Sequence, residues 1–242
     1  MRNGFLLVGG LLALWQGLFL IAGAHALAPP VDTVLYLGHL LGTARFWGHL
    51  CETGRAFAAA LALSIVLGLG MGLPFGLNKL AAEVAEPMLV SAYAVPKIVL
   101  FPIVLLIFGI GLPAKIAFGA IHGVIPVAIF AMAGVRQVNP VLLRTAQALR
   151  MSRTDTLRCI VWPAALPEIF SGLRIGFSLT LIGTLLGEMF GSQKGLGYLL
   201  MNAIGLQNVP VIMAVTLLLV LFAASLSTAL LAVDRRLHRA QI

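Results

Sequence analysis

Charged residues are few in this sequence. Asp, Glu, Lys and Arg make up 10% of its 242 residues, whereas soluble domains carry roughly 25%. So few charges cannot coat a soluble surface of this size, which excludes a cytosolic enzyme, a secreted disulfide scaffold and a disordered regulator. Hydrophobic residues make up 60% of the chain, and the mean hydropathy is +1.05. We therefore predict an integral membrane protein of the all-α class.

Acidic residues, cysteine and several binding motifs are also scarce or absent. Eight acidic against sixteen basic residues give a net charge of +8. Cytoplasmic loops of membrane proteins collect such basic residues, so no nucleic-acid partner is expected. Cys51 and Cys159 are predicted on opposite sides of the membrane and therefore unbridged. The G-x-x-x-x-G-K-[ST] pattern and any metal-spaced His/Cys cluster are absent, so this chain is expected to hold no cofactor, and ATP would bind another chain.

Six apolar segments could cross a bilayer, for which about 20 residues are needed. They are residues 5–28, 56–78, 87–114, 116–135, 172–187 and 209–233, the fifth extending back toward Pro163. Lys97 and Arg174 are the only charges within them. The chain reads as one transmembrane domain over residues 1–242. It comprises a first helix and periplasmic loop (1–48) and a core (49–235) that contains a cytoplasmic loop (139–162).

The basic residues predict the orientation of these spans. With the N-terminus inside, ten basic residues lie in cytoplasmic segments, and four (Arg45, Arg55, Lys115 and Lys194) lie outside. The positive-inside rule therefore places both termini in the cytoplasm. Residues 24–26 and 26–28 resemble signal-peptidase sites, but the preceding apolar run exceeds the roughly 7–15 residues usual for a signal peptide. We expect the first helix to be retained; cleavage would leave five spans.

The segment from Asn139 to Pro167 has the most ordered pattern in the chain. Asn139-Pro140 suits the start of a helix, with asparagine as N-cap. An apolar stripe follows at helical spacing: Leu142, Leu143, Ala146 and Leu149. Ser152-x-x-Asp155 has the form of a capping box for a second helix. We predict two short amphipathic helices joined by a turn near Arg150-Met151, suited to docking a cytoplasmic partner. A basic loop lying on anionic lipid is the alternative.

This segment resembles a motif of ATP-binding-cassette (ABC) importer permeases of the nitrate/sulfonate/taurine type. Their pattern is Glu-Ala-Ala, three residues, Gly, nine residues, Ile-x-Leu-Pro. It aligns with Arg144-Thr145-Ala146, Arg150 and Ile160-Val161-Trp162-Pro163. Further similar stretches are HLCETGRAF (49–57), VPKIVLFPIVLLIFGIG (95–111), PAALPEIFSGLRIG (163–176) and GEMFGSQKGLGYLL (187–200).

The resemblance implies a type I ABC importer permease fold in the bacterial inner membrane, working by alternating access. It implies two ATP-binding subunits on the cytoplasmic loops, a second permease copy, giving a homodimer, and a periplasmic substrate-binding protein. The permease itself would not be an enzyme. Its coupling residues would be Arg144, Thr145, Ala146, Leu149, Arg150, Ser152, Arg153 and Asp155.

Two of these residues depart from the family pattern. Arg144 replaces a glutamate, and Arg150 replaces a glycine at the turn. An arginine at position 150 costs about 1–2 kcal/mol if the turn requires left-handed backbone. Alternatively, the turn lies one residue later, or the partner carries a compensating acidic groove.

Six polar residues are candidates for the solute pathway. Lys97 lies within a span, where a charge should face protein, water or an interface, and it could attract an anionic ligand. Tyr93, Ser178, Thr180, Thr184 and Glu188 complete the set. Each has a structural alternative, such as hydroxyl bonding to its own helix. The Gly109-Ile110-Gly111 break, flanked by prolines, would suit a cavity lining or a plain kink.

Other functions fit the sequence less well. A secondary carrier or channel working without an ATPase would need ionisable residues in its spans, and only Lys97 and Arg174 occur there. An intramembrane hydrolase would need a partner for His122, and no paired motif supplies one. We therefore expect import of a small anionic solute, sulfonate-, taurine- or nitrate-like.

Overall fold

Helices make up most of the residues that the structure describes. This computed structural model describes residues 2–239, and no strand occurs among them, which confirms the all-α class. The helices are α1 (Arg2–Ala22), α2 (Pro30–Leu41), α3 (Ala44–Leu77), α4 (Lys79–Ala94), η1 (Lys97–Leu100), α5 (Phe101–Phe108), α6 (Leu112–Arg136), α7 (Pro140–Ala148), α8 (Arg153–Thr156), η2 (Leu157–Val161), α9 (Trp162–Gly191), α10 (Leu196–Gly205) and α11 (Val209–Arg239).

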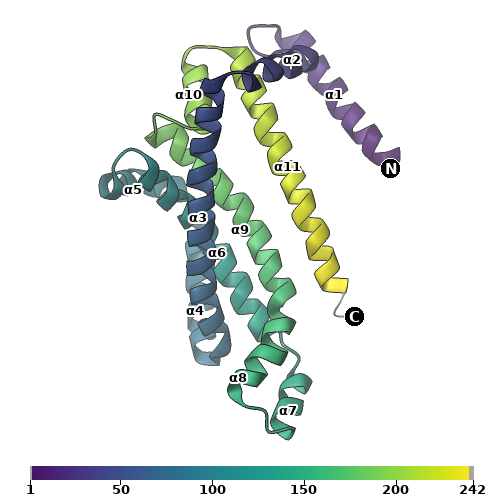
Figure 1. The fold of residues 1–242 in the computed structure, drawn as a ribbon, viewed down its shortest axis with the longest axis vertical. Coiled ribbons are helices and arrows are strands. Elements are labelled where there is room, and N and C mark those ends of the chain that lie inside the picture. Colours follow the sequence, from purple (N-terminus) through teal and green to yellow (C-terminus); the bar gives the residue numbers. More distant parts are fainter. Residues whose placement is uncertain (1, 240–242) are drawn as a thin grey trace.

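Three long helices form the centre of the molecule. Helix α6 packs along both α3 and α9 (Figure 1). In the most apolar stretch of each helix, 56% of the residues of α6 are buried, compared with 11% of those of α11. Helix α6 is therefore the central helix, and α11 presents most of its apolar surface outward. The short helices α7 and α8 lie at one end of the bundle, while α2 and α10 lie at the other.

Small residues allow the central helices to approach closely. A Cβ atom at Gly72 of α3 would overlap the carbonyl oxygen of Ala128 in α6. One at Gly123 of α6 would overlap the hydroxyls of Ser64 and Thr180 on the flanking helices. Glycine at these two positions removes the side chain that would hold the backbones apart, which is the usual means of tight helix packing in membranes.

The prediction of six continuous spans needs correction. Within the part of the chain that the structure describes, four helices are long and apolar enough to cross a membrane: α3, α6, α11 and the uninterrupted helix Arg153–Gly191, which joins α8, η2 and α9. A fifth crossing is possible only as a broken one, α4 followed by Lys97–Phe108, bent by 84°. Helix α1 covers Arg2–Ala22 and contains the apolar stretch Leu6–Ala22.

The predicted span 87–114 is divided by proline and glycine. Helix α4 ends at Ala94, because Val95 precedes Pro96 and such residues disfavour helical backbone. Gly109 (φ +71°) and Gly111 (φ +133°) separate α5 from α6, and these positive values favour glycine. The break predicted at Gly109–Gly111 is therefore present, and the sharper bend at Pro96 adds a second interruption.

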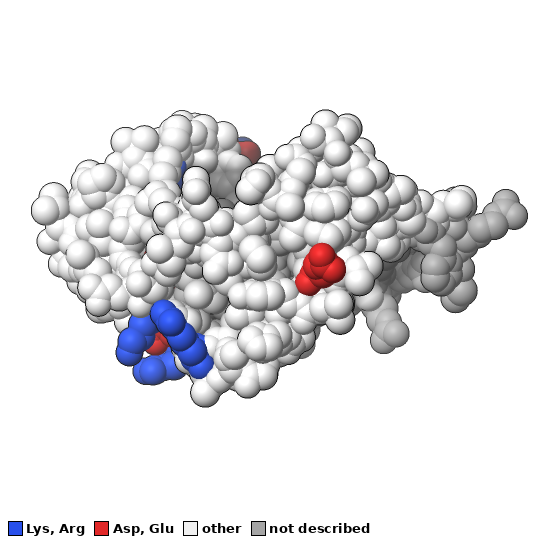
Figure 2. Space-filling model, turned by 90° about the horizontal axis from the view of Figure 1, so that it is seen from above, with Lys and Arg blue, Asp and Glu red and all other residues white. Residues whose placement is uncertain are grey.

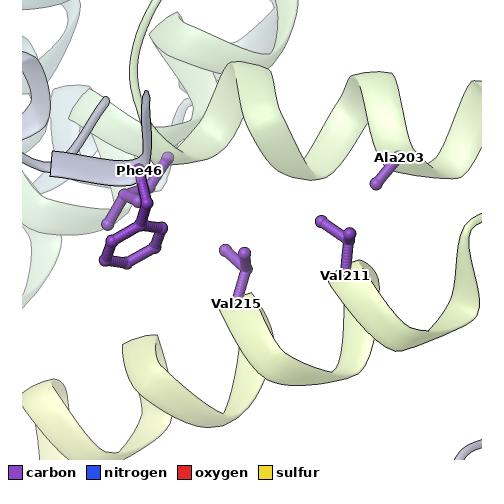
Figure 3. Close-up of a cluster of buried hydrophobic side chains, with 5 residues drawn as sticks. Phe46, Ala203, Val211 and Val215 are labelled. Carbon is purple, nitrogen blue, oxygen red and sulfur yellow. The ribbon is translucent and has the colours of Figure 1, made fainter. Parts of the chain in front are cut away.

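Contacts between side chains attach the outer helices to this core. Phe46 of α3 packs with Leu196 and Ala203 of α10 and with Val211 and Val215 of α11 (Figure 3). These helices therefore share one apolar cluster at the end of the bundle that carries α10. A hydrogen bond from Trp15 Nε1 to the Ala28 carbonyl (3.0 Å) holds α1 against the turn that follows it.

Two further findings concern single residues. Arg174 of α9 has its Nε 3.7 Å from Asp234 Oδ2 of α11. Ser171 donates to the other oxygen of Asp234 at 3.1 Å, so this contact ties α9 to α11. Cys51 and Cys159 are both free and exposed, as predicted.

Candidate functional site

Residues 139–156, here called the elbow, begin with the predicted cap. The Asn139 side-chain oxygen accepts the backbone N–H of Val141 at 2.9 Å, and Pro140 is the first residue of α7. The cap satisfies one of the N–H groups that a helix start leaves free, and proline lacks such a group altogether. The local sequence therefore fixes where α7 begins.

Arg150 occupies left-handed backbone at the turn of the elbow, with φ +51°. Its N–H donates to Gln147 and that of Met151 donates to Ala146, each at 3.0 Å. This is the Schellman pattern that ends helices and favours glycine. The position at which the family motif has glycine therefore requires left-handed backbone. Arg150 adopts this backbone conformation at a cost of about 1–2 kcal/mol. The alternative of a turn one residue later is wrong.

The second half of the elbow differs from the prediction. Ser152 Oγ accepts the Asp155 N–H at 3.1 Å and donates to its carboxylate at 2.6 Å, so the predicted cap is present. However, α8 is not a separate short helix. It continues through the wider π turn of η2 into α9. Pro163, which cannot donate a backbone hydrogen bond, lies two residues after the end of that turn.

Only part of the predicted apolar stripe of α7 packs against the core. Leu143 and Ala146 line a groove of about 690 Å³ between the elbow and the ends of α3 and α6. Leu142 and Leu149 are 45% and 69% exposed. The other coupling residues are also exposed: Arg144, Thr145, Arg150, Ser152, Arg153 and Asp155. The elbow thus presents apolar and basic groups together on its outer surface.

The six predicted pathway residues do not come together. Lys97 lies at the bend after α4, where its Nζ donates to the Tyr93 carbonyl at 3.1 Å and lies 5.0 Å from the Tyr93 ring centre. Ser178 is exposed on α9 and bonds the Arg174 carbonyl. These three groups keep their predicted role as a hypothesis.

Thr180 and Thr184 are both fully buried, and their predicted place on the solute pathway stays a hypothesis. The Thr180 hydroxyl lies 3.1 Å from Ser64 Oγ of α3, and Thr184 donates to the Thr180 carbonyl. In this conformation they join packed helices. His122 is likewise buried, with its Nδ1 2.9 Å from the Phe118 carbonyl.

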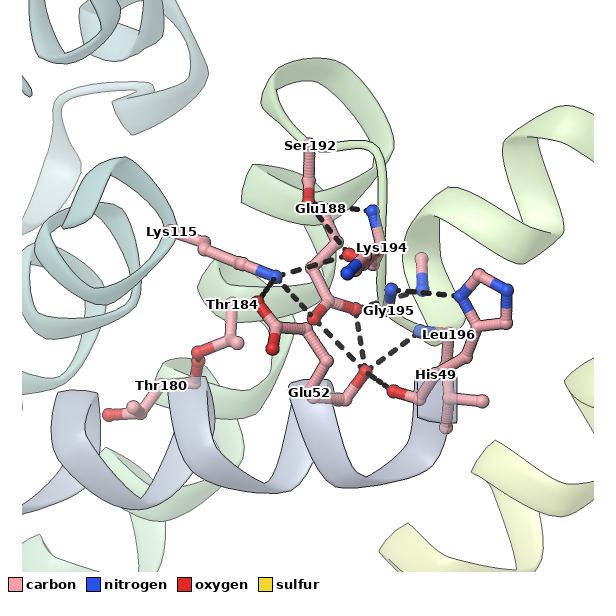
Figure 4. A network of polar contacts seen from close by, with 12 residues as sticks. His49, Glu52, Lys115, Thr180, Thr184, Glu188, Ser192, Lys194, Gly195 and Leu196 are labelled. Carbon is pink, nitrogen blue, oxygen red and sulfur yellow. Dashed lines mark hydrogen bonds and ion pairs between the residues drawn. The ribbon is translucent and has the colours of Figure 1, made fainter. Parts of the chain in front are cut away.

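Glu188, the sixth residue, belongs to a buried group of charges that we call the ion cluster: Glu52, Lys115 and Glu188 (Figure 4). Lys115 Nζ lies 2.9 Å from Glu52 Oε1 and 3.5 Å from Glu188 Oε1. The side chains of Lys115 and Glu188 are completely buried. Charges so removed from water are stable only when paired and hydrogen-bonded. The cluster joins α3, α6 and α9 at the end opposite the elbow.

The ion cluster also holds the loop between α9 and α10. Glu188 accepts the N–H of Gly197 at 3.0 Å and the hydroxyl of Thr53 at 2.8 Å, while Thr53 accepts the N–H of Leu196 at 2.7 Å. Lys115 donates to the carbonyl of Lys194 at 3.1 Å. The carbonyl of Lys194 and the N–H groups of Leu196 and Gly197 thus have partners in α6, α3 and α9 (Figure 4).

Gly195 makes this contact possible. It has φ +120°, and any Cβ atom there would overlap the Glu188 carboxylate. Its N–H donates to His49 Nδ1 at 3.1 Å. The segments HLCETGRAF and GEMFGSQKGLGYLL, separated by more than a hundred residues in the sequence, therefore meet around one buried carboxylate.

Comparison with known proteins identifies the family. The family described as the binding-protein-dependent transport system inner membrane component matches residues 64–241. The chain belongs to this family. The result confirms the resemblance drawn from the elbow and from the segments that meet at the ion cluster. Its members are transport permease subunits rather than enzymes, and the family implies an ATP-binding subunit and a substrate-binding protein as partners.

Curated relatives of this permease cover most of its length. It is 31% identical over 194 residues to the taurine transport system permease protein of Escherichia coli K12, covering 80% of this chain and 70% of the relative. It is 30% identical to a putative aliphatic sulfonates permease of Bacillus subtilis, covering 83% and 74%. A probable ABC transporter permease of Haemophilus influenzae is 32% identical, covering 97% and 94%.

Solved structures share the fold of the permease. A chain of the inward-facing MetNI methionine ABC transporter superposes with a TM-score of 0.66 at 19% identity, covering 77% of this chain and 93% of that one. A chain of an amino acid ABC transporter gives 0.66 at 20% identity, covering 83% and 98%. These similarities confirm an ABC importer permease fold.

Sequence reasoning missed the role of Lys115 in the permease. We placed it in an outer loop, whereas it is the buried centre of the ion cluster. One signal was available: Lys115 follows Pro113 by two residues at the start of an apolar helix. A lysine there must reach an acidic partner, and Glu52 and Glu188 are close to the ends of other spans.

Proposed function

We propose that this chain is the transmembrane subunit of an ATP-driven importer for a small anionic solute, with the elbow docking the ATP-binding subunit. The main support for this proposal is the structure of the elbow. Its caps and Schellman turn hold α7 in one position, while Arg144, Thr145 and Leu149 remain exposed on the outer surface. A fixed helix with an exposed leucine among arginines suits a groove on a partner protein better than a lipid surface.

The orientation we propose places the elbow in the cytoplasm. Basic residues gather at that end: Lys79, Arg136, Arg144, Arg150, Arg153 and Arg158 all lie on or next to α4, α7 and α8. The positive-inside rule favours this arrangement, with both termini on the same side and the ion cluster near the periplasmic surface.

A complete transporter would contain two copies of this chain, two ATP-binding subunits and one periplasmic binding protein. Exposed apolar residues on the bent α4–α5 pair support the second copy. Val99, Ile103, Leu106 and Ile107 are all more than half exposed there, and such surfaces require lipid or another helix. ATP binding would draw the two elbows together, and the helices would then open the pathway outward.

The relatives support a sulfonate or similar anion as the solute, because taurine and aliphatic sulfonates both carry a sulfonate group. Lys97 is the pathway cation we assign to it. We propose that the chain holds no cofactor of its own, because it lacks a phosphate-binding loop.

Copurification from native membranes tests the proposed function. An ATP-binding subunit should accompany the wild-type chain and be lost from the variant R144E/L149D, because both side chains face outward from α7. The control K79E reverses an exposed charge at the same end on α4 and should retain the subunit. Purification of the wild-type chain alone, with solute transport into vesicles without ATP, would show a carrier or channel instead.

A charge reversal tests coupling more directly. In reconstituted complexes, R144E/R153E should lower ATP-driven solute uptake about tenfold or more relative to ATP hydrolysis, since two docking charges are inverted. Uptake per ATP equal to wild type in this variant would contradict the proposed role of the elbow.

A further inference from the structure

The end of the molecule opposite the elbow carries a group of exposed basic side chains. Arg45, Arg55 and Lys194, here called the basic patch, line a hollow of about 320 Å³ with Glu52. Figure 2 views the molecule from this end and shows basic side chains gathered around an acidic one, while most of the surrounding surface is uncharged. The basic side chains in this view are therefore gathered mainly in one place, while another acidic group lies apart from them.

Among the described residues, no unpaired acidic side chain forms an ion pair with the basic patch. Its acidic neighbour Glu52 is already paired with the buried Lys115 at 2.9 Å. Over residues 2–239, none of the ion pairs involves Arg45, Arg55 or Lys194. The three cations are therefore available to an outside anion.

Folding alone does not explain this arrangement. Arg45 and Arg55 are separated by almost three turns of α3 and lie on the same side of it as His49 and Glu52. Lys194 approaches them from the α9–α10 loop, which the ion cluster holds in place. Gathering like charges costs folding energy, so an external acidic partner is the simplest reason for it.

We propose that the basic patch binds carboxylate groups on the surface of the transporter's substrate-binding protein. This inference rests on the proposed function, which places this end of the molecule in the periplasm. Complementary charges between protein surfaces speed association and select the correct partner. Three cations around a hollow fit an acidic protrusion on the binding protein.

The patch is connected directly to the helices of the core. Glu52 belongs both to the hollow and to the ion cluster, and the main chain of Lys194 accepts a hydrogen bond from Lys115 at 3.1 Å. A carboxylate drawn to Lys194 or Arg55 therefore acts next to the contacts that join α3, α6 and α9. Docking of the binding protein would be sensed at this point.

Binding measurements on the complete transporter test the inference. The permease and its ATP-binding subunit are reconstituted in nanodiscs of phosphatidylcholine. They are titrated with the periplasmic binding protein that stimulates ATP hydrolysis by the wild-type complex. We expect the wild-type affinity to fall between 50 and 300 mM NaCl, because salt screens exposed charges. The variant R45E/R55E should bind about tenfold more weakly or worse, with little salt dependence left.

Matched variants separate charge from folding. R45K/R55K retains the charges and should bind like wild type, as should K79E at the elbow end. K194E tests the loop side of the hollow alone and should weaken binding in the same direction. All variants are compared as monodisperse complexes of unchanged subunit composition.

Three results would overturn the inference. Wild-type affinity in both R45E/R55E and K194E would show that the patch does not contact the binding protein. A defect seen only in nanodiscs containing phosphatidylglycerol would identify the patch as a lipid site. If no binding protein stimulates the wild-type complex, the proposed function fails and this inference fails with it.

Discussion

Two residues other than glycine adopt left-handed backbone at helix ends in this permease. Arg150 ends α7 at φ +51°, and Gln207 follows α10 at φ +52°. At Gln207 the same pair of hydrogen bonds occurs, from Gln207 to Ile204 and from Asn208 to Ala203. Each such residue costs about 1–2 kcal/mol relative to glycine. Both turns keep their geometry because the hydrogen bonds of the helix end require it.

Replacing Arg150 with glycine should therefore stabilise the folded permease. We expect R150G to raise the melting temperature of the detergent-purified protein by about 2 °C, from relief of about 1 kcal/mol of backbone strain. Q207G should act similarly at the other turn, which makes it the matched control. A lower melting temperature for R150G alone would show that the arginine side chain stabilises the elbow by a contact of its own.

Removing one charge from the ion cluster should lower the stability of the permease more than removing a pair of opposite charges. K115M leaves two carboxylates buried or half-buried without their cation, and we expect a loss of about 3–5 kcal/mol in stability. K115M/E188Q should recover part of this loss, because fewer negative charges remain. K97M is the control, since Lys97 forms no ion pair among the described residues. Equal melting temperatures for K115M and K97M would contradict the importance of the cluster.

The local sequence was enough to predict the helix caps and the turn, whereas the ion cluster could be recognised only from the folded structure. Asn139, Ser152 and Arg150 act through backbone groups within a few residues, so their effects follow from spacing alone. Lys115, Glu52 and Glu188 are far apart in the sequence. Only the packing of three helices brings them within hydrogen-bonding distance, and sequence reasoning therefore assigned Lys115 to the wrong environment.

At the scale of the helices, apolar length predicted the central elements well and the peripheral ones poorly. Helices α3, α6 and α11 match predicted spans, because each is one continuous apolar run. The segment 87–114 is equally apolar, and its hydropathy does not reveal the 84° bend at Val95-Pro96. Likewise, the polar residues of the elbow concealed that α8 continues without interruption into α9.

Close packing of α6 against its neighbours makes a further prediction. We expect G123A to destabilise the folded permease by about 1–3 kcal/mol, because the new methyl group would overlap Ser64 and Thr180. G70A on α3 is the matched control, since a Cβ atom there meets nothing within 4 Å, and alanine favours the helix. Thermal unfolding of both variants in detergent gives the comparison; similar melting temperatures would argue against tight packing at Gly123.

At the scale of the whole molecule, chemical labelling of the two cysteines can test the proposed orientation of the permease in the membrane. Cys51 lies on α3 beside the basic patch, and Cys159 lies in η2 next to the elbow. Both are exposed and free. In intact inner-membrane vesicles of right-side-out orientation, a membrane-impermeant maleimide should label Cys51 alone, and permeabilisation should add Cys159.

The variants C51S and C159S, each with one remaining cysteine, identify which site is labelled. The opposite pattern, with Cys159 labelled before permeabilisation, would reverse the proposed orientation. It would then place the basic patch in the cytoplasm, away from any periplasmic protein.

The continuity of Arg153–Gly191 has a mechanical consequence. At 1.5 Å per residue, these 39 residues form a rod of about 58 Å that begins in the elbow and ends three residues beyond Glu188. A tilt of about 5° around its midpoint would displace each tip by about 2.5 Å in opposite directions. That distance is enough to separate Glu188 from Lys115. One continuous helix could thus carry the movement of the ATPase from the elbow to the opposite end of the molecule.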